Sequence, residues 1–135
     1  MIFVDTSFWI ALRLRRDSRH REALALLHAT SSEPLVTSNH VRGETWTFLR
    51  ARDGHRSAVT YLESLEESSR VRVERVGGQL EDEALGWLRR HDERVYSFVD
   101  ATSFALMRAL RVTEALAFDG DFAAAGFVEL RPLDQ

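Results

Sequence analysis

Short apolar segments alternate with longer helix-like segments along the whole chain, and this alternation restricts the fold more than any other feature. Strands are expected at residues 2–4, 35–37, 71–76, 115–118 and 127–130. Helices are expected over residues 8–14, 18–29, 39–52, 58–65, 80–88 and 98–110. Chains of this pattern form parallel sheets covered by helices. The sequence therefore predicts an α/β fold, with a mostly parallel central sheet of four to five strands and helices on both faces.

The length and the even composition predict one domain over residues 1–135. The sequence contains no internal repeat and no change of composition that would mark a boundary. It has no run of about 18 apolar residues, so no membrane span is expected. The apolar start is short and contains Asp5, which does not fit a secretory signal. Because the chain also lacks cysteine, a cytoplasmic location is expected.

Composition excludes several classes of chemistry. With no cysteine, the chain has no disulfide framework, thiolate zinc site or cysteine nucleophile. All 18 basic residues are arginine, which excludes a P-loop lysine and Schiff-base chemistry. The five histidines show no metal-ligand spacing, and there is no G-x-S-x-G motif. The formal charge of −3 provides no overall positive field for nucleic acid, so phosphate contacts would have to be local.

Acidic residues follow two of the expected strands directly. Asp5 comes after the first strand, and Asp119 and Asp121 come after the strand at 115–118. In open α/β sheets, ligands bind beyond the carboxyl ends of the strands, near the point where the strand order reverses. We therefore expect these three acids to lie along the same edge of the sheet.

Two further acids lie on expected helices beside apolar residues. Glu44 shares about 100° of helix surface with Val41 and Phe48, so it is expected to project from an apolar stripe. Asp100 begins the most apolar helix of the chain, with Phe104 on its own face. A buried carboxylate is costly unless it gains a partner or shifts its pKa.

Each acid also has a purely structural explanation. Asp5 can cap a helix, and Ser97-x-x-Asp100 fits a capping box. Asp119-Gly120 is a turn signal, and Glu44 can reach solvent or pair with an arginine. These explanations treat one acid at a time. They do not account for acids from four places along the chain meeting at one edge.

Clustered carboxylates without histidine or cysteine suit Mg²⁺ or Mn²⁺. Such an ion activates water and offsets charge on phosphate, so metal-assisted phosphodiester hydrolysis is the expected chemistry. Ser103, one turn beyond Asp100, could hydrogen-bond a metal-bound water, or could be an ordinary helix serine. Arg13, close to Arg15 and Arg16, could contact substrate phosphate, or could lie on a solvated helix face. Trp9 and Trp46 could stack on a base, but we expect both to pack in the core.

Four segments together resemble PIN-domain nucleases of the VapC toxin type, over nearly the whole chain. They are Val4-Asp5-Thr6-Ser7, residues 37–45 (TSNHVRGET), Phe98-Val99-Asp100-Ala101, and residues 117–122 (AFDGDF). Each segment alone is weakly specific. Their occurrence in this order, in a chain of 135 residues, is specific.

The resemblance implies a PIN fold and an Mg²⁺- or Mn²⁺-dependent ribonuclease that acts as the toxin of a toxin–antitoxin pair. It also implies a homodimer held inactive by a VapB-type antitoxin, which often places an arginine on the acids. The catalytic, metal-binding acids of the family correspond to Asp5, Glu44, Asp100 and Asp119. Asp121 matches a further acid that many members carry, and Thr6 matches a small hydroxyl residue with an outer-sphere or phosphate-binding role.

Two other classes of function remain open from the sequence. The first is a non-catalytic binding module of PIN-like fold, in which the acidic pocket holds an arginine-rich partner. The second is a phosphotransfer enzyme that uses the Asp-Gly-Asp at residues 119–121. The second is disfavoured because the chain has no lysine to neutralise a phosphoryl group.

Overall fold

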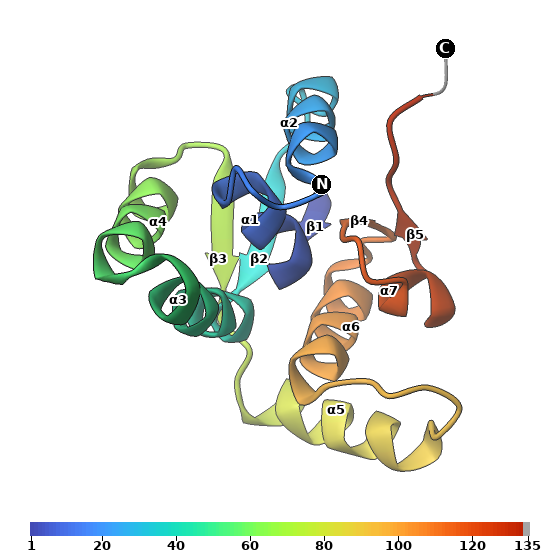
Figure 1. The fold of residues 1–135 in the computed structure, drawn as a ribbon. Helices are drawn as coiled ribbons and strands as arrows, with labels where there is room; N and C mark the ends of the chain where they lie inside the picture. The colour runs from blue at the N-terminus through green and yellow to red at the C-terminus, as the bar shows by residue number, and fades with distance from the viewer. Residues whose placement is uncertain (134–135) are drawn as a thin grey trace.

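The computed structural model describes residues 1–133, and its strands form one parallel sheet of five strands (Figure 1). The strands are β1 (Ile2–Val4), β2 (Leu35–Ser38), β3 (Val71–Glu74), β4 (Glu114–Leu116) and β5 (Val128–Glu129). Their order is β3-β2-β1-β4-β5, and every neighbouring pair is parallel. The expected α/β fold with a parallel central sheet is confirmed.

Helices connect the strands. They are α1 (Thr6–Arg13), α2 (His20–Ala29), α3 (Asn39–Asp53), α4 (His55–Glu67), α5 (Gly78–Arg90), α6 (Phe98–Leu110) and α7 (Asp121–Ala124). The sequence predicted the first six within a few residues, but α7 was not predicted. In the part of the chain that the structure describes, no helix is both long and apolar enough to cross a membrane.

The direction of the strand order reverses at β1. The chain runs from β1 through β2 to β3, and then returns to place β4 and β5 on the other side of β1. Because such crossovers are right-handed, the helices before and after this return cover opposite faces. Figure 1 shows α3 and α4 on the side of β3, and α5, α6 and α7 on the side of β4 and β5. The crevice between the ends of β1 and β4 is therefore the position where ligands bind in such sheets.

Register brings the residues after β1 and β4 together. Phe3 pairs with Ala115 and Val4 with Leu116, and the amide of Asp5 donates a hydrogen bond to the carbonyl of Leu116 (3.1 Å). The chain that leaves β4 toward Asp119 therefore starts beside Asp5. The three residues of β1 are all buried, which fixes this edge within the core.

An aromatic cluster fixes α6 against its neighbours. The buried ring of Phe104 lies 5.2 Å from Trp87 of α5 and 5.0 Å from Phe122 of α7, between ring centroids. Phe122 also stacks on Phe3 of β1 at 5.9 Å. Because Asp100 lies one turn before Phe104, this cluster holds the start of α6 relative to α7 and β1.

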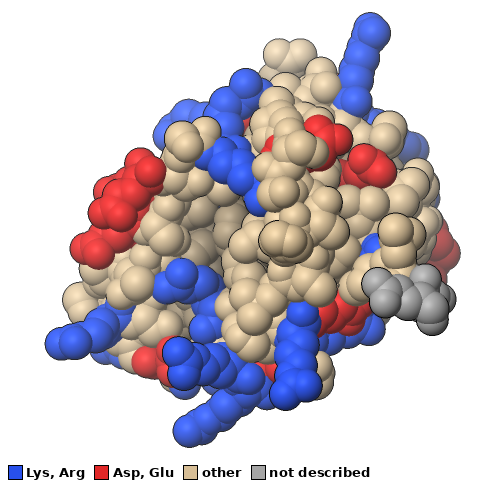
Figure 2. Space-filling view, turned by 90° about the horizontal axis from the view of Figure 1, so that it is seen from above, with Lys and Arg blue, Asp and Glu red and all other residues tan. Residues whose placement is uncertain are grey.

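Arginine side chains are unevenly distributed over the surface. On the face shown in Figure 2, several arginine side chains gather along the lower edge with a few acidic side chains among them, and further groups of both kinds lie at the left and the top. A net charge of −3 therefore coexists with locally basic regions.

Removal of the central aromatic ring should destabilise the fold strongly. We expect Phe104→Ala to lower the free energy of unfolding by about 3–5 kcal/mol, because it leaves a cavity where α5, α6 and α7 meet. Urea denaturation followed by circular dichroism measures this change. Val95→Ala is the control, because the side chain of Val95 is 97 % exposed, and its effect should stay within about 0.5 kcal/mol. Equal effects of the two substitutions would contradict the role given to the cluster.

Candidate metal centre

The carboxyl ends of β1 and β4 open into a pocket of about 470 Å³. Its wall comes from the start of α1, from α3, from the segment before α6 and from the segment around the start of α7. The lining residues are Asp5, Thr6, Ser7, Ile10, Glu44, Phe48, Val95, Ser97, Asp100, Asp119 and Asp121. All five acids singled out in the sequence therefore face one pocket, which we call the acid pocket.

Three of these acids lie closest together. One carboxylate oxygen from each of Asp100, Asp119 and Asp121 lies within 4.8 Å of the corresponding oxygens of the other two. Asp5 and Glu44 line the same pocket outside this trio. Asp121 was expected on the same edge of the sheet as Asp5 and Asp119, and as a further acid of the family; the geometry groups it most closely with Asp100 and Asp119.

Hydrogen bonds to one oxygen of Asp5 and one oxygen of Asp100 fix the orientation of these two acids. Asp5 Oδ2 accepts from the amide (3.1 Å) and the hydroxyl (2.7 Å) of Ser7. Asp100 Oδ2 accepts from the amide of Ser97 (3.0 Å), and Ser97 Oγ accepts from the amide of Asp100 (2.9 Å). Within residues 1–133, the second oxygen of Asp5 and of Asp100 accepts no hydrogen bond. Capping is therefore compatible with a ligand role, because it uses only one oxygen of each carboxylate.

Ser7 links the two strand ends that form the pocket. Its hydroxyl donates to Asp5 and accepts a hydrogen bond from the amide of Phe118 (3.0 Å), which precedes Asp119. This one side chain therefore connects the start of α1 to the segment that follows β4. From the sequence, Ser7 is expected near the cap of the first helix, and is not expected to link two strand ends. A hydroxyl residue two positions after an acid at a helix start was the available signal.

Burial and mutual repulsion raise the pKa values of the acids. Burial, with the charge of Asp119 next in weight, raises the pKa of Asp5 from 3.8 to about 8, although the Ser7 donors oppose this. Burial is also the main cause that raises the pKa of Asp100 to about 7. Burial raises the pKa of Asp119 as well. Without a cation, the pocket therefore retains protons that free carboxyl groups would release.

Glu44 lies in the pocket but not in the apolar stripe where it was expected. The buried face of α3 consists of Val41, Thr45 and Leu49, and Glu44 is exposed. Phe48, also expected to face the core, is half-buried and lines the pocket beside Glu44. The expectation of a buried Glu44 was wrong. The side of α3 that carries Glu44 faces the crevice between β1 and β4 rather than the core.

Arg94 lies against the acids from the loop between α5 and α6. Its Nε donates to Asp121 Oδ1 (2.6 Å), and its Nη2 donates to the carbonyl oxygen of Asp119 (3.0 Å). Gly120, with a φ of +82°, leaves room for this contact, because a Cβ there would lie 3.0 Å from Arg94 Nη2. Sequence gave no signal for this pair, whose members are 27 positions apart.

The remaining predicted residues occupy different positions. Thr6 is buried and lines the pocket, and within residues 1–133 its hydroxyl has no hydrogen-bond partner. Ser103 is buried but does not line the pocket, because its hydroxyl donates to the carbonyl of Val99 (2.9 Å). Arg13 lines a neighbouring pocket. Trp9 packs in the core, edge-on to Tyr61, as expected.

The donor set fits a hard divalent cation. It consists of oriented carboxylates with further oxygens free, and a buried hydroxyl without a partner that a metal-bound water or a phosphate oxygen could satisfy. Raised carboxyl pKa values are the expected result when charged ligands converge without their ion. The pocket is therefore a possible metal-binding site.

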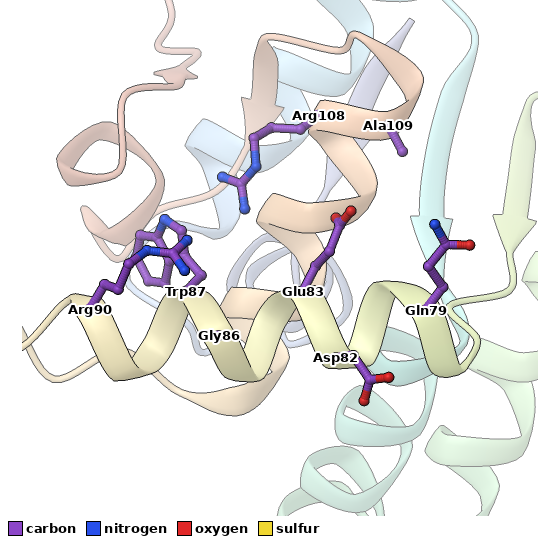
Figure 3. Close-up of a pocket in the computed structure, with 8 residues that line it drawn as sticks. All are labelled: Gln79, Asp82, Glu83, Gly86, Trp87, Arg90, Arg108 and Ala109. Atoms are coloured by element: carbon purple, nitrogen blue, oxygen red, sulfur yellow. The ribbon is translucent and has the colours of Figure 1, made fainter.

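A larger pocket of about 800 Å³ lies elsewhere, between α5 and α6 (Figure 3). It is lined by side chains of both charge signs: Asp82 and Glu83 of α5 lie in the same pocket as Arg90 and Arg108. In Figure 3, Asp82 points away from α6 while Arg108 points toward α5. This mixed surface lacks the convergent acids of the acid pocket, so it does not provide an equivalent cation site.

Comparison with known proteins agrees with the fold. A relative from Mycobacterium tuberculosis, named 23S rRNA-specific endonuclease VapC20, is 58% identical over 132 residues, covering 98% of this chain and 99% of that protein. A crystal structure of M. tuberculosis VapC20, described as a Sarcin-Ricin loop cleaving toxin, matches at 57% identity with a TM-score of 0.91, covering 98% of this chain and all of that one. FitAcB from Neisseria gonorrhoeae shares the fold at 15% identity and a TM-score of 0.68, with 98% of each chain covered.

The family model for the PIN domain matches residues 2–128, which include every acid of the pocket. This chain belongs to the PIN domain family.

Proposed function

We propose that this protein is a divalent-metal-dependent endoribonuclease that cuts ribosomal RNA and acts as a toxin. The observation that carries the proposal is the convergence of Asp100, Asp119 and Asp121 on one point of a pocket that Asp5 also lines. The substrate class is supported by the 58% identity to a protein named as a 23S rRNA-specific endonuclease. The sarcin–ricin loop is the first RNA to test, because the VapC20 structure is described by that target.

The five acids of the pocket and Thr6 each have a proposed role. Asp100, Asp119 and Asp121 hold the ion through their free oxygens, and Asp5 completes the acidic wall. The bound ion would lower the pKa of a water molecule and offset charge on the phosphate under attack. The unpartnered hydroxyl of Thr6 is placed to donate to a phosphate oxygen or to a metal-bound water. Glu44, which is open to solvent, is placed to orient the attacking water or to accept its proton.

We further propose that a small VapB-type antitoxin controls this activity, and that the toxin is a homodimer in the cytoplasm. Arg94 supports the first part, since its contact with Asp121 demonstrates that a guanidinium fits against the acids. A partner arginine would make the same type of contact. The 58% identity to a VapC toxin is the second support.

The same Arg94 contact favours a second candidate function. In this alternative, the pocket is a non-catalytic binding site for an arginine-rich partner, and its acids serve only to attract that partner. Calorimetry distinguishes the two hypotheses, because the nuclease must bind Mn²⁺ without a partner. Absence of Mn²⁺ binding, together with tight binding of an arginine-rich peptide, would support the alternative.

Neutralising Asp5 should abolish cleavage without unfolding the protein. We expect Asp5→Asn to lower the rate of RNA cleavage by at least about a hundredfold with Mg²⁺ or Mn²⁺, because a charged group of the pocket is lost. Asparagine is an equally good helix cap, so the circular dichroism spectrum should not change. Cleavage of a labelled rRNA fragment on denaturing gels measures the effect, and EDTA should reproduce it with the wild type.

Asp82→Asn is the matched control for Asp5→Asn. Asp82 is an exposed acid on α5, outside the acid pocket, so this variant should cleave at the wild-type rate. A wild-type protein that cleaves no RNA with either ion, or an Asp5→Asn variant that remains active, would disprove the proposed mechanism.

The fall of stability with rising pH should be reduced when metal is added. Asp5 and Asp100, with pKa values raised to about 8 and about 7, hold protons in the folded state that the unfolded chain releases above about pH 4. The metal-free protein should therefore lose stability as the pH rises from about 5 to about 8. Mn²⁺ takes the place of these protons, so the increase in Tm on adding Mn²⁺ should grow over the same range.

Differential scanning fluorimetry in EDTA and in Mn²⁺ tests this linkage. The Asp5→Asn variant is the control, because without the Asp5 carboxyl the loss of stability in EDTA should be smaller. A metal-free wild type that becomes more stable between about pH 5 and about pH 8 would show that the carboxyl pKa values are not raised.

A further inference from the structure

A second pocket lies along α1 and α3 beside the acid pocket, and the two pockets together are called the α1–α3 groove. Ile10 of α1 and Phe48 of α3 form the wall of the acid pocket on this side. Arg13 and Arg52 lie one turn further along the same two helices, next to Ile10 and Phe48 on the helix surfaces. The guanidinium of Arg52 lies 5.0 Å from the centroid of the Phe48 ring. The wall of the acid pocket and the two arginines are therefore neighbours along α1 and α3.

Arginines line the far end of this groove. The second pocket, of about 490 Å³, is lined by Arg13, Leu14, Arg15, Arg16, Arg52 and Asp53. We call this the arginine pocket. Its lining contains four arginines and one aspartate, so the pocket is strongly positive in a protein whose net charge is negative.

These four arginines have no acidic partners of their own. In the described residues 1–133, none of them forms an ion pair within 4.0 Å, whereas Arg94 and Arg131 pair with Asp121 and Glu129. Arg15, Arg16 and Arg52 are exposed, so water screens their mutual repulsion, and an anion bound between them would relieve the remainder. The fork of a guanidinium matches the oxygens of a phosphate.

The distance from the acids suits a polymer rather than a single phosphate. Asp5 and Arg13 are separated by eight positions of α1, or about 12 Å along the helix. This length corresponds to roughly three or four stacked nucleotides at ~3.4 Å each, and to fewer where the strand is extended. A strand with one phosphate near Thr6 can therefore place later phosphates among the arginines.

We propose that the RNA strand on one side of the cleaved bond runs along the α1–α3 groove and is bound through its phosphates by Arg13, Arg15, Arg16 and Arg52. This inference rests on the proposed ribonuclease function. Phosphate contacts fix the position of a strand without reading its bases. The arginine pocket thus determines which bond of a bound RNA reaches the acids, and it provides the attraction that the acid pocket lacks.

Two pairs of adjacent arginines provide a matched test. Arg15→Gln/Arg16→Gln removes two charges from the arginine pocket. Arg89→Gln/Arg90→Gln removes two charges from the end of α5, where both side chains are likewise exposed and form no ion pair within residues 1–133. Both variants change the net charge equally. Circular dichroism and thermal melting establish that each is folded.

Binding is measured without catalysis, by fluorescence anisotropy of a labelled sarcin–ricin loop RNA in EDTA. The Arg15/Arg16 variant should bind roughly tenfold more weakly, and the plot of log K against log salt should be less steep by roughly 1.5–2 units, because about two phosphate contacts are lost. The Arg89/Arg90 variant should lie within twofold of the wild type. Equal losses in both variants, or no loss in either, would overturn the proposal.

Cleavage kinetics and truncated RNAs test the position of the strand. With Mn²⁺, the Arg15/Arg16 variant should raise KM and leave kcat at saturating RNA close to that of the wild type. Shortening the RNA on one side of the cut, and only on that side, should remove the difference between variant and wild type. A difference that survives truncation on either side would contradict the proposed path.

The outcomes distinguish this inference from the proposed function. If the wild type cleaves no RNA but binding in EDTA still depends on Arg15 and Arg16, the nuclease mechanism fails and the RNA-binding groove remains. If the Arg15/Arg16 variant retains its RNA affinity and instead loses affinity for a labelled glutamate-rich peptide, the groove binds an acidic protein segment and this inference is wrong.

Discussion

Desolvation and mutual repulsion of carboxylates at the ends of β1 and β4 dominate this structure. Asp5 follows the central strand β1. The register of β1 with β4 brings Asp119, three residues after the end of β4, into the same pocket as Asp5. The pKa of Asp5 rises to about 8, which expresses the cost of holding these charges together without a cation. The fold maintains this arrangement through contacts elsewhere, chiefly the aromatic cluster around Phe104 and the buried strand β1. Such locally unfavourable groupings in a stable fold are typical of functional sites.

Caps are the means by which the fold orients these acids. Ser7 and Ser97 each bind one oxygen of a neighbouring aspartate and leave the other oxygen toward the pocket. Ser7 also receives the amide of Phe118, so helix start, central strand and the segment after β4 form one hydrogen-bonded unit. The capping hydrogen bonds that begin α1 and α6 therefore also orient possible metal ligands. No further residues are needed to orient Asp5 and Asp100.

Sequence reasoning succeeded where the signal is periodic or local. Alternating segments gave the parallel fold, acids directly after strands gave the shared edge, and Ser97-x-x-Asp100 gave the capping box that the structure contains. It failed where tertiary contacts decide. Glu44 was expected in an apolar stripe, but that edge of α3 faces the crevice. The four residues of α7 are too few to show a helical period, and the Arg94–Asp121 pair joins segments with no local relation. The functional roles of the acids stay predictions.

The acid pocket combines residues that lie far apart in the sequence. Asp5 follows β1, but β1 obtains its β4 neighbour, and the pocket its Asp119 and Asp121, only after more than a hundred further residues have been made. During translation the N-terminal strand must wait, unpaired on that side, for a partner more than a hundred residues away. A nascent polypeptide that does not yet include β4 and α7 therefore carries no finished pocket.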